Sequence, residues 1–275
     1  MLDRELMSLA SPVLVSEQCK ICDSRVRPFG AGRVLGRHDV RYYRCETCGF
    51  VQTEPPYWLE EAYRTALVAA DVGAAQRNIE LAALTQAVIQ QFFRADGRFL
   101  DYGGGYGLFV RLMRDRGFDF RWHDRYAPNL LSRGFEAAPE TKGFELVTAF
   151  EVLEHLVDPV PELAEMLRRG ESVLCTTQIL PATSPKPGEW WYYALSGGQH
   201  VSLFTLEALH RLAARFGRRL VSDGVSVHLI TSQRMAEWLF PLVLRRRVHG
   251  VLNRFRRRKS LLPSDFQALT GERLD

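Results

Sequence analysis

Apolar residues recur along most of the chain with two different spacings, and segments of the two kinds alternate from about residue 97 onward. Short runs rich in apolar residues predict strands, and segments with apolar residues three or four positions apart predict amphipathic helices. The predicted strands cover residues 98–102, 118–124, 144–150, 172–178, 219–222 and 225–231. The predicted helices between them cover residues 106–117, 127–133, 159–169 and 206–217. Strands that alternate with helices predict an α/β fold with a mainly parallel, doubly wound sheet.

Two more segments with helical spacing, residues 57–71 and 74–93, precede this alternation and are expected to connect it to the N-terminal region. Little room is left between Asp124 and Phe144 for a full strand, so residues 133–137 (RGFEA) are predicted to form a short substitute. The predicted regions are an N-terminal module (1–58), connecting helices (59–96), a main domain (97–232) and a C-terminal tail (233–275).

Four of the five cysteines form two Cys-x-x-Cys pairs, Cys19 with Cys22 and Cys45 with Cys48, separated by 22 residues. In a reducing compartment this spacing favours a metal site over disulfides. Two such pairs complete a closed tetrahedral shell of four sulfurs around Zn²⁺. The sequence therefore predicts a small zinc-ribbon-like module whose Zn²⁺ is structural. A redox pair is the weaker alternative, since it would not need the second pair.

A glycine-rich loop follows the first strand of the main domain, with glycines at 103, 104, 105 and 107. The sixth residue from Gly103 is Leu108, so the dinucleotide pattern G-x-G-x-x-G/A fails, and no Gly-Lys-Ser/Thr triplet follows for a phosphate loop. What remains is acid-x-Gly-x-Gly-x-Gly, starting at Asp101. This pattern resembles the first motif of class I S-adenosylmethionine-dependent methyltransferases.

The resemblance implies a cofactor site for S-adenosylmethionine. It assigns Asp101, Gly103, Gly105 and Gly107 to the first motif. Asp124, at the end of the second strand, is the expected acid that accepts hydrogen bonds from the ribose hydroxyls. Phe150 and Glu151, in the segment AFEVLEH after the fourth strand, are expected to lie against the methionyl part.

The N-terminal cysteines and the stretch GGQHVSLFT (197–205) resemble bacterial sugar C-methyltransferases and related methyltransferases from surface-polysaccharide clusters. The resemblance implies an acceptor that is a sugar or a glycan precursor, with His200 as candidate general base. Gln199 stands where that family has a Glu, and Gln cannot supply the charge that would help to remove a proton from carbon. O-methylation is therefore slightly favoured over C-methylation. A loop-orienting role for His200 is the alternative.

Three more residues are candidates for the catalytic end of the site. Glu154 and His155 fall within about one helical turn of Glu151, so they could share a face beside the methyl donor, although a helix-start role for the acids is equally plausible. Tyr192 belongs to the aromatic stretch EWWYYALSG (189–197), which is interpreted either as a substrate lid or as a lid packed onto the core.

The tail carries eight Lys or Arg residues and no acid between Arg245 and Lys259, whereas the rest of the chain is net acidic. Its apolar positions from Leu244 onward follow one helical face. A basic amphipathic segment of this kind suits contact with a membrane surface, and packing onto the main domain with solvated arginines is the equal alternative.

Composition is that of a globular protein, and the first residues lack the basic and apolar segments of a secretory signal. The expected location is the cytoplasm, peripheral to the inner face of the membrane if the tail binds there. Two other functions stay open: an RNA methyltransferase with a zinc module, and a non-catalytic protein that holds the cofactor as a structural ligand. The acidic balance outside the tail disfavours nucleic acid. The sequence does not predict an oligomeric state.

Overall fold

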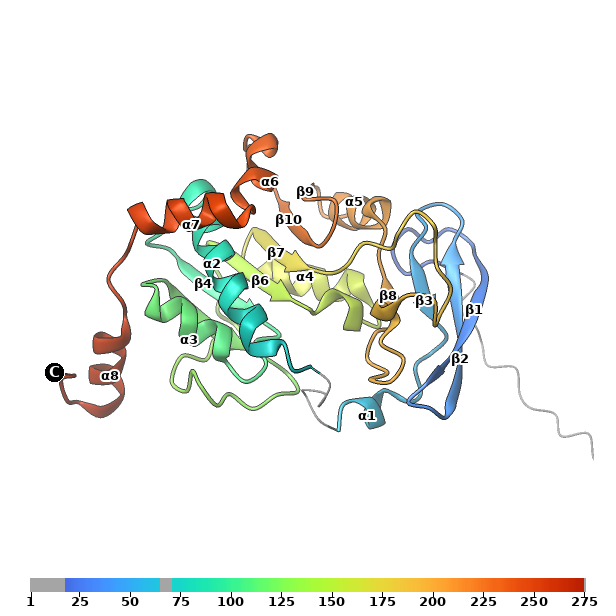
Figure 1. Cartoon of the computed structure of the whole chain (residues 1–275), viewed down its shortest axis with the longest axis horizontal. Helices are drawn as coiled ribbons and strands as arrows, with labels where there is room; N and C mark the ends of the chain where they lie inside the picture. Colours follow the sequence, from blue (N-terminus) through green and yellow to red (C-terminus); the bar gives the residue numbers. More distant parts are fainter. Residues whose placement is uncertain (1–17, 65–70, 275) are drawn as a thin grey trace, which may run out of the picture.

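The computed structural model describes residues 18–64 and 71–274, which contain two β-sheets (Figure 1). The larger sheet has the order β5-β4-β6-β7-β10-β9. Its strands are β4 (Arg98–Tyr102), β5 (Asp119–His123), β6 (Leu146–Phe150), β7 (Ser172–Thr176), β9 (Arg219–Ser222) and β10 (Val227–Thr231). Strands β4 to β7 pair in parallel, and β10 is antiparallel to both of its neighbours. The predicted α/β class with a mainly parallel sheet is confirmed.

Helices cover both faces of this sheet. They are α2 (Ala74–Phe92), α3 (Leu108–Asp115), α4 (Pro159–Arg169) and α5 (Leu206–Ala214). Along β4, Phe99 packs into a core with α2 and α3, whereas the next residue, Leu100, packs into a core with α4 and α5. Successive side chains of a strand point to opposite faces, so a strand buried on both faces has a continuous apolar run.

The smaller sheet is antiparallel and has the order β1-β2-β3-β8. Its strands are β1 (Val26–Val34), β2 (His38–Cys45), β3 (Val51–Thr53) and β8 (Ser202–Leu203). Strand β8 comes from the main region and pairs with β3, with Leu203 opposite Val51. A short helix, α1 (Leu59–Ala62), follows the smaller sheet. The N-terminal region and the main region therefore share a sheet, and the boundaries between the regions stay a prediction.

Two predicted helices differ from the structure. The helix predicted over 127–133 is wrong: the Asn129 side chain accepts from the Ser132 N–H at 3.0 Å and donates to the Ser132 carbonyl at 2.8 Å. Such local side-chain bonds compete with helix formation. The strand predicted over 133–137 is reduced to one parallel bridge between Trp122 and Glu136. Of the helix predicted over 57–71, only α1 is formed among the described residues, and residues 65–70 lie outside them.

The tail forms η3 (Glu237–Leu239), α6 (Phe240–Val243), α7 (Arg246–Phe255) and α8 (Leu262–Thr270), and α7 covers most of the helix expected from Leu244. Helix α7 lies along α2 (Figure 1), where the Asn253 side chain donates to the Ala83 carbonyl at 2.7 Å. Helix α8 is tied to α3 by a buried ion pair between Arg114 and Asp265 at 2.6 Å. The tail thus packs onto the main region, which is one of the two interpretations that its sequence allowed. No described helix combines the length and apolarity needed to cross a membrane.

Candidate active site

The loop after β4 uses three glycines in backbone conformations that other residues rarely adopt. Gly103, Gly105 and Gly107 have φ angles of +75°, +52° and +86°. A Cβ on Gly103 would lie 2.6 Å from the Val152 side chain, whereas a Cβ on Gly105 would meet nothing within 4 Å. The backbone at Gly105 therefore borders open space, where a ligand can approach it closely.

Asp124, just beyond the end of β5, holds this loop in place. Its Oδ2 accepts from the Gly105 N–H at 2.9 Å, and its Oδ1 accepts from the N–H groups of Tyr126 and Ala127 at 2.7 and 2.8 Å. Behind the loop, the Trp122 indole N–H donates to the Gly105 carbonyl at 2.9 Å. The predicted motif acid of the second strand is thus in direct contact with the glycine loop.

A cavity of about 960 Å³ lies beside the loop. It opens beyond the carboxyl ends of the parallel strands, where ligands bind in sheets of this kind. The predicted cofactor residues that line it are Gly103, Gly105, Asp124 and Glu151. The predicted catalytic residues that line it are His155, Tyr192, Gln199 and His200. One cavity therefore joins the expected cofactor end to the expected acceptor end.

Asp101 and Phe150 support the site from behind and are not among the residues that line the cavity. The Asp101 carboxylate is buried and accepts from the Thr148 hydroxyl at 2.7 Å. Burial raises the pKa of Asp101 to about 7, while the Thr148 hydrogen bond opposes this shift. The Phe150 ring packs against Phe109, with the ring centroids 5.0 Å apart. In this structure Asp101 is held by Thr148 behind the loop, and Phe150 packs against the core that contains Phe109.

Glu151 has a φ of +53°, which is rare for a residue with a side chain. Its N–H donates to the Thr176 hydroxyl at 2.9 Å, and that hydroxyl donates to the Glu151 carboxylate at 2.8 Å. The reciprocal bonds hold this unusual backbone and place a carboxylate at the cavity wall. Backbone strain of this kind concentrates at functional sites.

His200, His155 and Tyr192 meet at the other end of the cavity. The His200 ring lies 4.9 Å from the His155 ring and 4.7 Å from the Tyr192 ring, measured between centroids. Nδ1 of His200 is 2.6 Å from the Tyr192 carbonyl, which can only accept, so Nδ1 carries the proton and Nε2 the lone pair. Burial lowers the pKa of His200 to about 4 and that of His155 to about 3, the latter also through the neighbouring His200. Both imidazoles are neutral at pH 7.

Glu154 lies in the turn η1 (Leu153–His155), ahead of α4, so the helix-start role considered for it does not apply. Its side chain is fully buried. Burial, followed by the charge of Glu151, raises the pKa of Glu154 to about 8. The nearby Tyr192 and Thr177 hydroxyls oppose this shift, although neither makes a hydrogen bond of good geometry to the carboxylate oxygens among the described residues.

Gln199 points away from this group. Its amide donates to the Ala62 carbonyl of α1 at 2.8 Å, so it joins the loop before β8 to the N-terminal region. Tyr63, which the sequence reasoning missed, follows α1 and brings its hydroxyl to 3.2 Å from Nδ1 of His155. Its ring stacks on Tyr126, with centroids 5.0 Å apart. No motif marks Tyr63 in the sequence, because its role arises only when α1 packs over the cavity.

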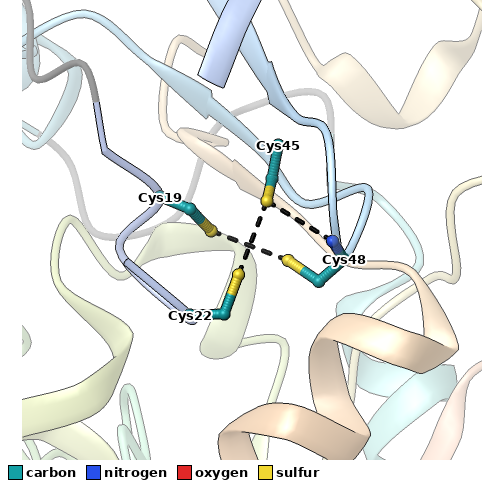
Figure 2. A group of neighbouring side chains, drawn as sticks. All are labelled: Cys19, Cys22, Cys45 and Cys48. Carbon is teal, nitrogen blue, oxygen red and sulfur yellow. Dashed lines mark hydrogen bonds between the residues drawn. The ribbon is translucent and has the colours of Figure 1, made fainter. Parts of the chain in front are cut away.

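The four paired cysteines converge at the base of the smaller sheet (Figure 2). Sulfur atoms of Cys19 and Cys48 are 3.6 Å apart, those of Cys22 and Cys45 are 3.5 Å apart, and all four lie within 4.8 Å of one another. A tetrahedral ion with bonds of about 2.3 Å to sulfur would place its ligands roughly 3.8 Å apart. The four thiols therefore have a spacing that could hold a metal ion.

The surroundings of the cysteines match a pair of metal-binding turns. The N–H groups of Thr47 and Cys48 both donate to the Cys45 sulfur at 3.4 Å, and Gly49 closes that turn with a φ of +71°. The Thr205 hydroxyl, at the start of α5, donates to the Cys48 carbonyl at 2.5 Å. Three of the cysteines belong to the same core as α4 and α5. The cluster is thus built into the main region and does not stand apart from it.

A glycine loop after the first parallel strand, an acid after the second and a cavity beyond the strand ends define a class I methyltransferase-like fold. A family model described as a methyltransferase domain matches residues 74–223, more than half of the chain, and the chain belongs to this family. The chain therefore contains a methyltransferase domain. No curated protein matches the sequence.

Several solved structures are similar to this chain. TnmH has a TM-score of 0.46 and 21% identity, over 65% of this chain and 62% of that chain. CalO1, a methyltransferase in calicheamicin biosynthesis in its SAH-bound form, has a TM-score of 0.43 and 19% identity, over 58% and 54%. The plantazolicin methyltransferase BpumL in complex with SAH has a TM-score of 0.43 and 12% identity, over 70% and 89%. The matched region therefore spans less than two thirds of TnmH and of CalO1.

Proposed function

We propose that the methyl acceptor is a hydroxyl group of a sugar or a glycan precursor. The observation that carries this proposal is the single cavity that runs from Gly105 and Asp124 to His200 and Tyr192. A cofactor seated on the glycine loop would direct its methyl group toward the two histidines. The acceptor then enters from the side lined by the aromatic segment around Tyr192.

S-Adenosylmethionine supplies, when bound, a methyl group on a positively charged sulfur. Asp124 already accepts three backbone N–H groups, and a carboxylate has about four acceptor positions, so one remains for a ribose hydroxyl. Glu151 adds a negative charge at the cavity wall, which suits the positive groups of the methionyl part. Gly105 leaves the space that the ligand needs beside the backbone.

At the acceptor end, His200 presents the lone pair of Nε2, because its Nδ1–H is held by the Tyr192 carbonyl. A hydroxyl placed there can donate its hydrogen to this nitrogen while its oxygen faces the methyl group. His200 is therefore the candidate general base. Gln199 supplies no carboxylate beside it, because its side chain is a neutral amide, and this supports oxygen as the acceptor atom. That amide is bound to the Ala62 carbonyl.

The aromatic segment offers a surface for a sugar ring. Trp191 lines the cavity and is 74% exposed, although tryptophan is usually well buried. It lies edge-on to Tyr192, with centroids 5.2 Å apart. An exposed aromatic face beside polar groups is a common feature of small-molecule sites. The segment around Trp191 and Tyr192 is therefore the proposed contact for the sugar.

We further propose that Cys19, Cys22, Cys45 and Cys48 hold a structural Zn²⁺. Four thiolates leave no open position on a tetrahedral ion, so the ion would stabilise the fold and take no part in methyl transfer. It would fasten the two Cys-x-x-Cys turns to the core shared with α4 and α5.

The acceptor is tested by incubating the protein with S-adenosylmethionine labelled in its methyl group and fractions of nucleotide sugars and glycan precursors. The expected result is label in one sugar fraction, on an oxygen, as located by mass spectrometry. Label that appears only in RNA, or only on a sugar carbon, would contradict the proposal. The variant Asp124→Ala, which loses the ribose contact, serves as the control for cofactor-dependent labelling.

A further inference from the structure

Three side chains of the kinds that bind metal ions converge at the acceptor end of the cavity. Glu154 and His155 come from the turn after β6, and His200 comes from the segment before β8. One ligand atom from each lies within 4.8 Å of the others. The cysteine cluster is the other such group in the described parts of the chain. The two groups differ in chemistry, since one is all sulfur and the other is nitrogen and oxygen.

The Glu154 carboxyl group is fully buried. It is 0% exposed, and neither oxygen has a partner at good hydrogen-bond geometry within residues 18–64 and 71–274, while the Tyr192 and Thr177 hydroxyls lie close enough to lower its pKa. Buried polar groups are almost always paired, and an unpaired buried carboxylate is costly. A cation between Glu154 and the two imidazoles would stabilise the ionised carboxylate, which burial alone disfavours.

Hydrogen bonds to neighbouring groups fix both histidine rings, and His200 has the arrangement of a metal ligand. Nδ1–H of His200 donates to the Tyr192 backbone carbonyl at 2.6 Å, which fixes the ring and leaves Nε2 free to bind. Metal-binding histidines usually donate their other N–H to a carbonyl or carboxylate in this way. The His155 ring is held by the Tyr63 hydroxyl, 3.2 Å from Nδ1, and by a hydrogen bond to the Gln199 backbone. Both rings also line the cavity, so an ion bound by them would be reached from it.

We propose that Glu154, His155 and His200 bind a divalent first-row transition-metal ion whose open positions face the cavity and bind the acceptor hydroxyl. Two imidazoles and one carboxylate suit such an ion better than Mg²⁺, which prefers oxygen ligands alone. This site rests on the proposed function and changes one part of it: His200 binds the ion instead of taking the hydroxyl proton directly.

The step balances without any redox change. The ion-bound hydroxyl releases its proton to water in the open cavity, which leaves an alkoxide on the ion. The alkoxide oxygen forms a bond to the methyl carbon as the carbon–sulfur bond of S-adenosylmethionine breaks, and the electron pair of that bond stays on sulfur. The products are the methyl ether, neutral S-adenosylhomocysteine and one proton, and the ion stays divalent. A Lewis acid that lowers the pKa of a bound hydroxyl is a common role of such ions.

The test measures binding of Mn²⁺ by the full-length protein after dialysis against EDTA, using the electron paramagnetic resonance signal of the free ion. Mn²⁺ is suited to this test because it is a divalent first-row transition-metal ion that favours carboxylate oxygen, so the thiolates of the cysteine cluster compete poorly for it. We expect one Mn²⁺ per chain. Glu154→Gln and His200→Gln should each weaken its binding at least tenfold, with the melting temperature recorded for both.

Two matched variants serve as controls. Glu162→Gln removes an acid that lines the same cavity but pairs with Arg125, and His210→Ala removes an exposed histidine of α5. Both should bind Mn²⁺ as the unchanged protein does. Absence of Mn²⁺ binding in the unchanged protein, or equal binding in Glu154→Gln and His200→Gln, would overturn the proposal.

Methyl transfer separates this proposal from the proposed function. Transfer to a sugar that stops after EDTA and returns with Mn²⁺ supports both. Transfer that is unaffected by EDTA but lost in His200→Gln overturns the metal site and leaves His200 as the general base. Stoichiometric Mn²⁺ binding without transfer to any sugar fraction supports the metal site and overturns the sugar acceptor.

Discussion

The Gly105 N–H donates to the Asp124 carboxylate at 2.9 Å, which ties the loop after β4 to the end of β5. These two strands are neighbours in the sheet, so their carboxyl ends lie side by side. The carboxylate therefore shapes the glycine loop and also faces the cavity, where a ribose would lie. Loss of Asp124 should disturb the loop and the ligand contact together.

Cofactor affinity should depend on the open space at Gly105. In Gly105→Val a branched side chain would enter the cavity from a residue with a φ of +52°. Titration calorimetry should show that this variant no longer binds S-adenosylmethionine, and the same loss is expected for Asp124→Ala. Gly217→Val is the matched control, since Gly217 has a φ of +63° and open space but lies beyond α5. Both glycine variants should lose roughly 1–3 kcal/mol of stability from backbone strain. Unchanged affinity in Gly105→Val would refute the site.

The pH dependence of stability should reveal the buried Asp101. Its pKa is raised from 3.8 to about 7 by burial, so its contribution to stability is complete below pH 3.8 and is lost as the pH rises toward 7. Asp101→Asn keeps an acceptor for Thr148 but cannot ionise. Between pH 5 and 8 the unchanged protein should lose roughly 3 kcal/mol more stability than this variant in urea unfolding without cofactor. Parallel pH profiles would contradict the raised pKa.

Zinc content and stability should fall together in Cys45→Ser. Elemental analysis should find one zinc per chain in the unchanged protein and much less in the variant, with a melting temperature lower by several degrees. Structural zinc contributes directly to folding, because its site does not exist in the unfolded chain. Cys175→Ala is the control, since Cys175 is buried in β7 away from the cluster and its loss should leave the zinc in place. A zinc-free, equally stable protein would contradict the structural site.

His200→Ala should separate cofactor binding from turnover. His200 lies at the acceptor end, so affinity for S-adenosylmethionine should stay within about threefold, while turnover should fall by roughly 10² to 10⁴, the usual range for loss of a proton-transfer group. His210→Ala should change neither quantity. Turnover that survives in His200→Ala would leave this histidine with a role in orienting the loop before β8.

Contact of the tail with a membrane stays a prediction that vesicle flotation can check. Arg254 and Arg257 are exposed, and Phe255 between them is 82% exposed. Replacing both arginines by Ser should reduce binding to anionic vesicles, at about 1 kcal/mol for each charge. The same change at Arg27 and Arg33, which are exposed on β1, should have no effect. Equal flotation of the two double variants would remove the tail as a membrane contact.

Local patterns were enough to predict much of this fold. The apolar runs around Leu100 and Val173 predicted strands that the structure confirms, because a strand buried on both faces is mostly apolar. The pattern failed at residues 127–133, where Asn129 bonds to Ser132 and replaces a helical turn. The spacing of apolar residues in a short segment indicates a helix or a strand. It does not show where a side chain will bond to the backbone and prevent a helical turn.

By itself, the sequence determined the parts of the site that depend on spacing along the chain: the acid and glycines after β4, the acid after β5 and the two Cys-x-x-Cys pairs. Only the tertiary structure decided that Asp101 lies behind the loop, that Tyr63 reaches His155, and that His200 meets Glu154 and His155. Those relationships depend on strand order and on how α1 and the segment before β8 fold over the strand ends. These contacts between distant segments form where the segments meet over the strand ends, and no periodicity within a single segment encodes them.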